Sequence, residues 1–383
     1  MIENSYIEIN KKALKNNYEF IRNLIGANCE LTSVVKGNAY GHGIKNFVPT
    51  AHECGVKSFA VFSATEAKEI LDTGLDFSRI MIMGNIDNDQ LSWAVENDIE
   101  VYVFDQLRLS NIALQAAKQG KKAKVHIEVE TGLNRTGFNR KDLTKTLEFI
   151  RNNKDSVEIS GMCSHLAGAE NIANYYRINK QIKRFDNLEK VFQEQEVTAG
   201  KNHLACSAAM LNYPKTVKDL VRIGILQYGL WPSKEVKMAY MVKNKVMEDP
   251  LIPVLSWKSK VMSTKIVKMG EYVGYGNSLL AETDMRIATI PVGYSDGFAR
   301  SLSNQGKVII AGHRLDVVGI VNMNLCIVDV TNAEEVKIGD EVVMIGEQNG
   351  TNISVASFSD FSNQLNYELL TRLPNDIPRI ITK

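Results

Sequence analysis

Eight short apolar segments alternate with helix-patterned stretches between residue 30 and about residue 230. The apolar segments have the length of buried strands and span residues 31–36, 58–63, 80–84, 99–104, 123–130, 158–164, 202–207 and 222–229. Helical patterns between them include residues 65–72, 107–119, 140–152 and 171–193. This alternation predicts a parallel β/α architecture, and the number of segments favours a closed eight-stranded barrel of the TIM type. An open doubly wound sheet is the alternative, although no GxGxxG sequence follows the first segment.

The alternation stops after Trp231-Pro232. Residues 233–253 have the composition of a polar connection, and turn sequences such as Ser295-Asp296-Gly297 separate the apolar segments that follow. Those segments span residues 255–268, 285–292, 307–310, 315–321, 325–330 and 341–345, and residues 353–372 have a helical pattern. We therefore predict a β/α-barrel domain over residues 1–235 and a mainly β domain over residues 236–383. We expect the first residues of the chain to pair with the second domain.

Composition excludes several classes of partner. The 383-residue chain has 45 Lys+Arg against 44 Asp+Glu, a balance that argues against a general nucleic-acid or anionic-membrane partner. No apolar run approaches the roughly 20 residues of a membrane span, and the polar N-terminus has no secretory signal. The five scattered cysteines form no CxxC pair, which predicts free thiols in a reducing cytoplasm and no zinc site.

Lys36 stands where the first apolar segment ends and a glycine-rich turn begins. An ammonium group at the end of a buried strand is costly to desolvate. Such a lysine tends to have a lowered pKa, and its neutral amine can attack a carbonyl carbon. The alternative is a lysine whose aliphatic stem is buried while its ammonium group reaches solvent.

Residues 35–43, VKGNAYGHG, resemble the cofactor-lysine motif of the alanine racemase family, usually written VKANAYGHG. The only departure is Gly37. The resemblance implies that pyridoxal 5′-phosphate (PLP) is bound covalently to Lys36 and that Tyr40 reaches its phosphate. Further matches follow in the family's order as far as Pro378-Arg379, so the resemblance covers nearly the whole chain.

Ser207 follows the seventh predicted strand, and Gly224 and Ile225 lie within the eighth. A serine hydroxyl and backbone N–H groups suit a phosphate, although taken alone the pattern more often marks an ordinary loop and a buried strand. The resemblance implies that these three residues and Tyr367 bind the phosphate. Cys206 stands where many family members have asparagine.

Arg222 interrupts an apolar strand, so it requires a partner or a function. The resemblance implies that it faces the ring nitrogen of PLP. Because arginine stays protonated near neutral pH, it would not give that nitrogen a proton, which would limit side reactions such as transamination. The alternative is a buried ion pair with an aspartate or glutamate.

A racemase requires a base on each face of a planar α-carbon. The resemblance implies Lys36 as one base and Tyr275, in Gly274-Tyr275-Gly276, as the other. It also implies that His165 links this tyrosine to the arginine, and that the tyrosine comes from the other subunit of a head-to-tail homodimer. Taken alone, a tyrosine between glycines is more often a packing residue, and a lone histidine is more often a satisfied core residue.

Three further residues match substrate-binding positions of the family. The resemblance implies that Arg135 lies near the substrate carboxylate, that the backbone N–H of Met323 approaches that carboxylate, and that Tyr294 lies at the entrance of the site. Glu128 replaces a lysine that is carbamylated in many members, so we predict that this protein contains no lysine carbamate. Asn324 also departs from the family pattern, and both departures leave room for a different substrate.

The resemblance implies a PLP-dependent racemase that interconverts L- and D-alanine, a small amino-acid substrate, and so supplies cell-wall synthesis. A racemase for serine or for a broad range of amino acids is the alternative within the class. A barrel-type PLP amino-acid decarboxylase and a non-catalytic PLP-binding protein are the alternatives outside it.

Overall fold

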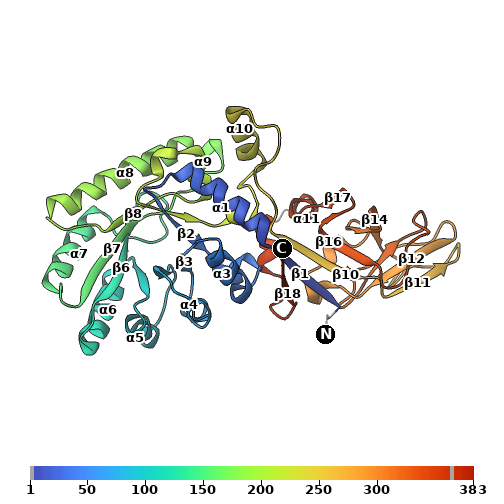
Figure 1. Ribbon diagram of the computed structural model, residues 1–383, viewed down its shortest axis with the longest axis horizontal. Helices are drawn as coiled ribbons and strands as arrows, with labels where there is room; N and C mark the ends of the chain where they lie inside the picture. Colours follow the sequence, from blue (N-terminus) through green and yellow to red (C-terminus); the bar gives the residue numbers. More distant parts are fainter. Residues whose placement is uncertain (1–3, 363–365) are drawn as a thin grey trace. The chain divides into compact units, whose positions relative to one another are not determined.

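The computed structural model describes residues 4–362 and 366–383 (Figure 1). Two compact units make up the chain. The first, here the barrel unit, comprises Ala13–Lys36 and Val48–Ile252, and the second, here the sheet unit, comprises Met1–Lys12, Gly37–Phe47 and Pro253–Lys383. The chain passes from the barrel unit to the sheet unit directly after Lys36.

Parallel strands form the barrel unit, as the alternating pattern predicts. They are β2 (Glu30–Val34), β3 (Ser58–Val61), β4 (Arg79–Ile82), β5 (Glu100–Val103), β6 (Ala123–Glu128), β7 (Val157–Cys163), β8 (Lys201–His203) and β9 (Leu220–Ile223). Their order in the sheet is β8-β7-β6-β5-β4-β3-β2-β9. Backbone bonds from Asp219 N to Asn202 O and from Arg222 N to Ala205 O, each 3.1 Å long, join its two ends. This nearly closed barrel confirms the predicted fold class.

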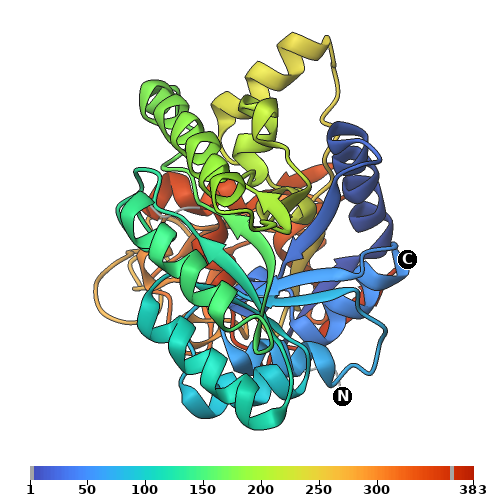
Figure 2. The same ribbon diagram turned by 90° about the vertical axis from the view of Figure 1, so that its left-hand side faces the viewer.

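Helices cover the outside of these strands, as Figure 2 shows for α5 to α8. The helices that follow β1 and the barrel strands are α1 (Lys11–Ile25), α3 (Ile44–Glu53), α4 (Ala64–Leu71), α5 (Asn88–Glu96), α6 (Gln106–Gln119), α7 (Arg140–Asn152), α8 (Tyr175–Glu194) and α9 (Ser207–Asn212). A capping box begins α4, because the Ser63 side chain accepts from Glu66 N and the Glu66 side chain accepts from Ser63 N in return. No helix within residues 4–362 and 366–383 has the length and apolar character needed to span a bilayer.

Two predictions about residues 222–253 are wrong. Residues 225–228 are not the end of a strand, because β9 stops at Ile223 and Ile225–Tyr228 form a 3₁₀ helix, η3. Gly224, with φ −103° and ψ −96°, turns the chain out of strand geometry, and an apolar run does not distinguish the two conformations. Residues 233–253 are not only a connection, because they contain α10 (Lys234–Asn244), whose buried side is confined to Val236. A helix with so little buried surface leaves a weak periodic signal.

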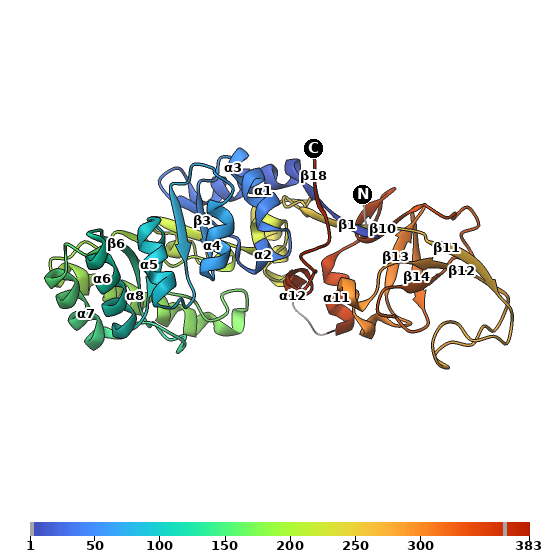
Figure 3. The same cartoon turned by 90° about the horizontal axis from the view of Figure 1, so that it is seen from below.

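Antiparallel pairing dominates the sheet unit, which confirms the predicted mainly β architecture (Figure 3). Within the described residues its strands are β1 (Ser5–Asn10), β10 (Leu255–Lys260), β11 (Ser263–Val267), β12 (Met285–Ile290), β13 (Lys307–Ile310), β14 (His313–Val318), β15 (Cys326–Asp329), β16 (Glu341–Gln348), β17 (Thr351–Ile353) and β18 (Arg379–Thr382). Their order is β11-β12-β15-β14-β13-β16-β10-β1-β18, and β17 pairs with β16. β1 is antiparallel to β10 and parallel to β18.

Short helices complete this unit. The helical pattern over residues 353–372 contains α11 (Val355–Ser362) and α12 (Asn366–Thr371), while residues 363–365 lie outside the described chain. The predicted apolar segment 255–268 is divided into β10 and β11. The remaining 3₁₀ turns of the two units are η1 (Ile172–Asn174), η2 (Pro214–Thr216), η4 (Tyr294–Asp296) and η5 (Arg300–Leu302).

The turn after Lys36, α2 (Lys36–Tyr40), is labelled in Figure 3, and its backbone angles are left-handed. Gly37, Asn38, Ala39 and Tyr40 have φ values of 64°, 52°, 54° and 51°. Non-glycine residues pay about 1–2 kcal/mol each for this conformation. Asn38 offsets part of this cost, because its Oδ1 accepts from Ile44 N at 2.9 Å and its Nδ2 donates to Asn375 Oδ1 at 2.7 Å.

Gly41→Ala is expected to destabilise the protein by more than about 3 kcal/mol, because overpacking against a rigid backbone adds to a left-handed φ. A Cβ atom at Gly41 would lie 1.9 Å from the carbonyl oxygen of Leu370. Gly270→Ala is the matched control, since Gly270 has a similar φ of 83° and no atom within 4 Å of its Cβ position. Urea denaturation measures both, and equal losses of stability would contradict this account of the turn.

Acid is expected to weaken the fold through His42. Burial lowers the pKa of His42 to about 4, whereas an unfolded histidine has a pKa of about 6.5. As the pH falls from about 6.5 to about 4, only the unfolded chain takes up this proton, so the free energy of unfolding declines by up to about 1.4 kcal/mol per pH unit. His42→Asn removes this titration and retains a donor for the Ala39 carbonyl that His42 Nδ1 contacts at 3.0 Å. Urea denaturation from pH 7 to pH 4.5 should give the variant a shallower slope, and identical slopes would refute the assignment.

Candidate active site

Strand β2 is held in place just before Lys36. The carbonyl oxygen of Val34 accepts from Gln227 Nε2 at 2.9 Å and from the Tyr228 hydroxyl at 3.0 Å, and Val35 N donates to Ala60 O at 2.9 Å. Since these partners come from η3 and β3, two neighbouring parts of the barrel fix the end of β2. Lys36 is thereby presented at the carboxyl end of the barrel, where β/α barrels carry their chemistry.

The ε-amine of Lys36 has a lowered pKa. Desolvation by surrounding protein atoms is the largest cause, and the positive charges of Arg135 and Arg222 act in the same direction, against a smaller opposite effect of Glu66. The side chain is nevertheless exposed at the barrel end. A larger neutral fraction and open access are the two properties that a nucleophilic or basic lysine requires.

Ser207 and Gly224 meet beside this end of the barrel. The Ser207 hydroxyl accepts from Gly224 N at 3.2 Å, and both residues are buried. Ile225 follows directly and is also buried. The structure therefore brings together the three barrel residues predicted to bind phosphate, and a hydroxyl with adjacent backbone N–H groups is suited to an anion of that kind.

Arg222 has no acidic partner among the residues that the structure describes, so the predicted alternative of a buried ion pair is not found there. Its Nη1 donates to His203 Nδ1 and, at 2.9 Å, to His203 O, while its Nη2 donates to Ser164 O at 2.7 Å. The guanidinium group is buried. It has five N–H groups, of which these bonds use three, so the Nε–H and one Nη2–H can serve a ligand.

Glu128 forms an ion pair with Arg135. One carboxylate oxygen lies 3.7 Å from Arg135 Nη2, and the other accepts from the Thr136 hydroxyl at 2.9 Å. Glu128 is buried, whereas the Arg135 side chain is exposed. A permanent carboxylate therefore lies beside Arg135, which can meet an anionic ligand at the open end of the barrel.

His165 is neutral in this environment. Burial, followed by the charges of Arg222 and Arg135, lowers its pKa to about 3. With His165 uncharged, the positive charges of Arg135, Arg222 and the protonated fraction of Lys36 dominate this end of the barrel. The resulting positive electrostatic potential favours a ligand with anionic groups, such as a phosphate and a carboxylate.

Several predicted site residues of the sheet unit, or the loops that carry them, contact one another within that unit. The rings of Tyr40 and Tyr367 lie 5.9 Å apart in an edge-on arrangement. Tyr294 N donates to Asn322 O at 3.0 Å, and Ser295 N donates to Met323 O at 2.9 Å, so the loops that carry Tyr294 and Met323 are joined.

Tyr275 occupies an exposed turn between β11 and β12. Gly274 and Gly276 on either side of it have φ values of 73° and 66°. The Tyr275 side chain is 70% exposed and the Met323 side chain 56%. Both are thus available to a ligand or to another chain.

Three polar residues of the barrel unit were missed by the sequence reasoning. His126 and His203 are fully buried and Glu100 nearly so, and all three belong to the chain of hydrogen bonds that begins at Arg222. A signal was available in the sequence, because each interrupts a short apolar strand, as Arg222 does. Thr136, which donates to Glu128, gave no comparable signal.

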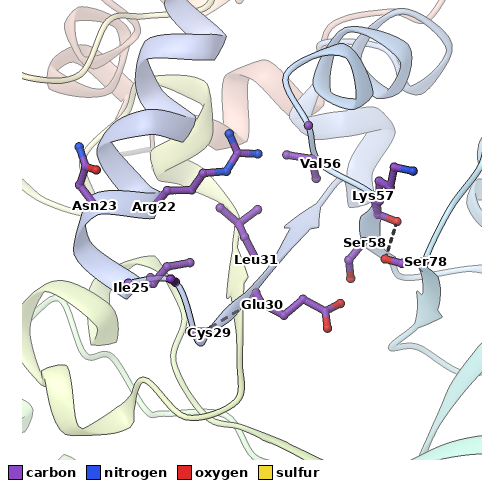
Figure 4. Close-up of a pocket in the computed structure, with 13 residues that line it drawn as sticks. Arg22, Asn23, Ile25, Cys29, Glu30, Leu31, Val56, Lys57, Ser58 and Ser78 are labelled. Atoms are coloured by element: carbon purple, nitrogen blue, oxygen red, sulfur yellow. Dashed lines mark hydrogen bonds between the residues drawn. The ribbon is translucent and has the colours of Figure 1, made fainter.

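A cavity of about 690 Å³ lies at the other end of the barrel (Figure 4). Residues near the amino ends of β2, β3 and β4 line it, including Arg22, Glu30, Lys57 and Ser78. It also contains Cys29, whose pKa is raised to about 11, mainly by burial, so that its thiol is a poor nucleophile near neutral pH. The cavity is separate from the carboxyl end that carries Lys36.

Comparison with known proteins gives a consistent result along the chain. Residues 9–232 match the family model described as alanine racemase, N-terminal domain, and residues 254–381 match alanine racemase, C-terminal domain. The chain is 37% identical over 380 residues to an alanine racemase of Clostridium perfringens, which covers 99% of this chain and 95% of the relative.

Solved structures agree with the sequence matches. Alanine racemase from Bacillus anthracis, solved with bound L-Ala-P, is 30% identical with a TM-score of 0.90, over 100% of this chain and 96% of that one. Alanine racemase from Bartonella henselae, with covalently bound pyridoxal phosphate, is 27% identical with a TM-score of 0.84, over 99% of both chains. This chain, with its β/α barrel and mainly β sheet unit, belongs to the alanine racemase family.

Proposed function

We propose that this protein is a PLP-dependent alanine racemase in which Lys36 holds the cofactor and Lys36 and Tyr275 are the two bases. The observation that carries the proposal is the environment of Lys36. The residue is exposed, its ε-amine has a lowered pKa, and it shares the barrel end with Arg135 and Arg222. Membership of the alanine racemase family supports the same activity.

The residues of the barrel unit fit PLP. The Lys36 amine can bond to its aldehyde carbon, and Ser207, Gly224 and Ile225 offer a hydroxyl and backbone N–H groups for its phosphate. Arg222 retains two N–H groups for the ring nitrogen, and Tyr40 and Tyr367 are the phosphate ligands expected from the sheet unit. When bound, PLP supplies the electron sink that makes the α-proton of an amino acid removable.

Each base of the protein serves one face of the substrate. The neutral amine of Lys36 accepts or returns a proton on one side of the α-carbon, and the Tyr275 hydroxyl does so on the other. Arg222 remains a donor and cannot protonate the ring nitrogen, because arginine stays charged in proteins. Neutral His165 is placed between the tyrosine and Arg222 in this proposal, as the family pattern implies.

Arg135 and the backbone N–H of Met323 bind the substrate carboxylate in this proposal, and Tyr294 lies at the entrance. The exposure of Tyr275 and Met323 supports a head-to-tail homodimer in which each subunit completes the site of the other. We extend the proposal to a cytoplasmic location, which the five free cysteines support.

Tyr275→Phe is expected to lower the racemisation rate by roughly 10²–10⁴-fold, the usual contribution of a general acid–base group. The visible absorption of the bound cofactor should persist, because Lys36 is unchanged. Tyr272→Phe is the matched control, since Tyr272 lies on the same loop and is also exposed, and it should retain activity within about twofold. Turnover by Tyr275→Phe at the level of the control would defeat the two-base assignment.

Product analysis tests the reaction itself. The purified protein should convert L-alanine to D-alanine and the reverse, and chiral chromatography of incubations with alanine, serine and lysine measures this directly. Equal or faster conversion of serine would replace the assigned substrate. Release of carbon dioxide from lysine without racemisation would identify a decarboxylase.

Glu128 is expected to make activity independent of carbon dioxide. A glutamate supplies a carboxylate beside Arg135 without modification, so wild-type kcat/KM should not change in carbon dioxide-depleted buffer. Glu128→Gln should raise KM for alanine by roughly tenfold, the loss of about one charge-assisted interaction. Glu128→Lys should lose activity in carbon dioxide-depleted buffer and regain it when bicarbonate is added. Electron density for a carboxylated lysine beside Arg135 in the wild-type protein would contradict the prediction.

A further inference from the structure

A continuous row of polar side chains crosses the interior of the barrel unit behind Arg222. Arg222 Nη1 contacts His203 Nδ1, and His203 Nε2 lies 2.8 Å from His126 Nδ1. His126 Nε2 lies 2.5 Å from Glu100 Oε2. The row thus joins the residue assigned to the ring nitrogen of the cofactor to a buried carboxylate near the amino end of β5.

Arg79 anchors the outer end of this row. Its Nε donates to the same Glu100 oxygen at 2.5 Å, and its Nη1 donates to Glu30 Oε1 at 2.5 Å. Glu30 also pairs with Lys201 and lines the cavity at the amino end of the barrel (Figure 4). Glu100 is therefore held as a carboxylate from two directions.

The barrel is shaped to hold the histidine pair. A Cβ atom at Gly161 would lie 2.5 Å from His126 Nδ1, so the absence of a side chain there provides the space for the ring. The pairing of β6 with β7 shifts register between Val125 and His126. The Tyr102 ring packs at 5.8 Å from His126 and 6.0 Å from His203, and both histidines are fully buried.

Donor and acceptor chemistry fixes the direction of the row. Arginine has only N–H donors, so His203 Nδ1 must accept from Arg222, and the hydrogen of His203 must be on Nε2. His126 Nδ1 must then accept from His203, which places the hydrogen of His126 on Nε2. That hydrogen points at Glu100, which accepts. Every contact is satisfied in this one arrangement with both rings neutral.

The charges around the pair agree with neutral rings. Burial is the largest influence on both histidines and lowers the pKa of each, with Arg222 adding to the effect on His203. Burial alone would raise the pKa of Glu100, but the bonds from His126 and Arg79 outweigh it and lower that pKa. A carboxylate at one end and a guanidinium at the other thus polarise two uncharged rings in the same direction.

We propose that His203, His126 and Glu100 are positioning residues for Arg222. The directed row holds both Nη1 hydrogens of Arg222 on His203, through its Nδ1 and its carbonyl oxygen, and so aims the remaining Nε–H and Nη2–H toward the cofactor. This inference rests on the proposed function, in which Arg222 faces the ring nitrogen. It adds that the orientation of this donor is set from the interior of the barrel.

A matched pair of substitutions separates two possible roles of His126: holding the hydrogen bonds of the row in one direction, and filling space in the barrel interior. His126→Asn keeps an acceptor near the position of Nδ1 for the His203 N–H, whereas His126→Leu has a similar volume and no acceptor. If the row orients Arg222, His126→Leu should lower kcat by roughly tenfold or more, the expected effect of losing a hydrogen bond coupled to a charged group, with KM nearly unchanged. His126→Asn should retain kcat within about threefold. If His126 only fills space, the apolar variant should perform at least as well as the polar one.

A spectroscopic readout accompanies these rates. The absorption maximum of the bound cofactor reports the surroundings of the pyridine ring of PLP. It should therefore move in His126→Leu and remain near the wild-type position in His126→Asn. Glu194→Gln alters an exposed ion pair with Arg140 and is the control for loss of a carboxylate. It should leave both kcat and the absorption maximum of the cofactor unchanged. A smaller loss in His126→Leu than in His126→Asn, with no spectral change, would overturn the proposal.

The hydrogen positions can be observed in the wild-type holoenzyme without an assay of activity. Nitrogen-15 NMR of histidine-labelled protein, or neutron diffraction, should place the hydrogen of both His126 and His203 on Nε2. A hydrogen on Nδ1 of either ring, or a doubly protonated ring, would overturn the inference even if both variants failed to fold. A protein that lacked racemase activity but showed this tautomer pattern would refute the proposed function and leave the directed row intact.

Discussion

The concentration of positive charge at the carboxyl end of the barrel is the constraint on which the rest of the site depends. Arg135, Arg222 and Lys36 influence one another there in partly desolvated surroundings. Like charges in a medium less polar than water repel strongly, and the groups that can release a proton respond first. Burial, reinforced by this repulsion, lowers the pKa of Lys36 and keeps His165 neutral, while the two arginines retain their charge. An anionic ligand relieves the same repulsion, which links affinity for a phosphate and a carboxylate to the reactivity of the amine.

The chain meets this constraint with a strand end that is rigid on one side and strained on the other. Val34 is tied to Gln227 and Tyr228, so the last residues before Lys36 have little freedom. Directly after Lys36 the backbone enters the left-handed turn. Strained backbone persists only where surrounding contacts over-determine it, and the bonds of Asn38 and the close approach of Gly41 to Leu370 provide such contacts. The position of the lysine is thus fixed by the backbone more than by its own side chain.

Sequence reasoning was most successful where one local signal determines the structure. The barrel strands and the sheet unit were predictable, because their apolar periodicity and turn residues agree with the final fold. It failed where tertiary packing decides between two local conformations, as for the apolar residues 225–228, which form a 3₁₀ helix instead of a strand. The helix α10 was missed for the related reason that most of its residues are not buried.

Residues of the site were predictable one at a time, but their connections were not. The sequence pointed to Arg222 because a charged residue in an apolar strand requires a partner or a function. The protein partner considered as the alternative was acidic, whereas the observed one is His203. Residues on β5, β6, β8 and β9 meet only when the barrel closes, and no spacing in the sequence encodes which rings will face each other. Gly161 illustrates the difficulty, since its importance comes from the His126 ring on the neighbouring strand.

A buried polar row is a poor way to gain stability. Burying Glu100, Arg79 and two imidazoles costs desolvation free energy that their mutual hydrogen bonds offset only in part. A core of well-packed apolar residues of similar volume is often as stable or more stable. Such networks do have one property that an apolar core lacks, because each donor accepts only a particular geometry and the whole row must be satisfied together. A barrel interior that retains this arrangement beneath Arg222 is therefore better explained by control over the direction of one guanidinium group than by the stability of the fold.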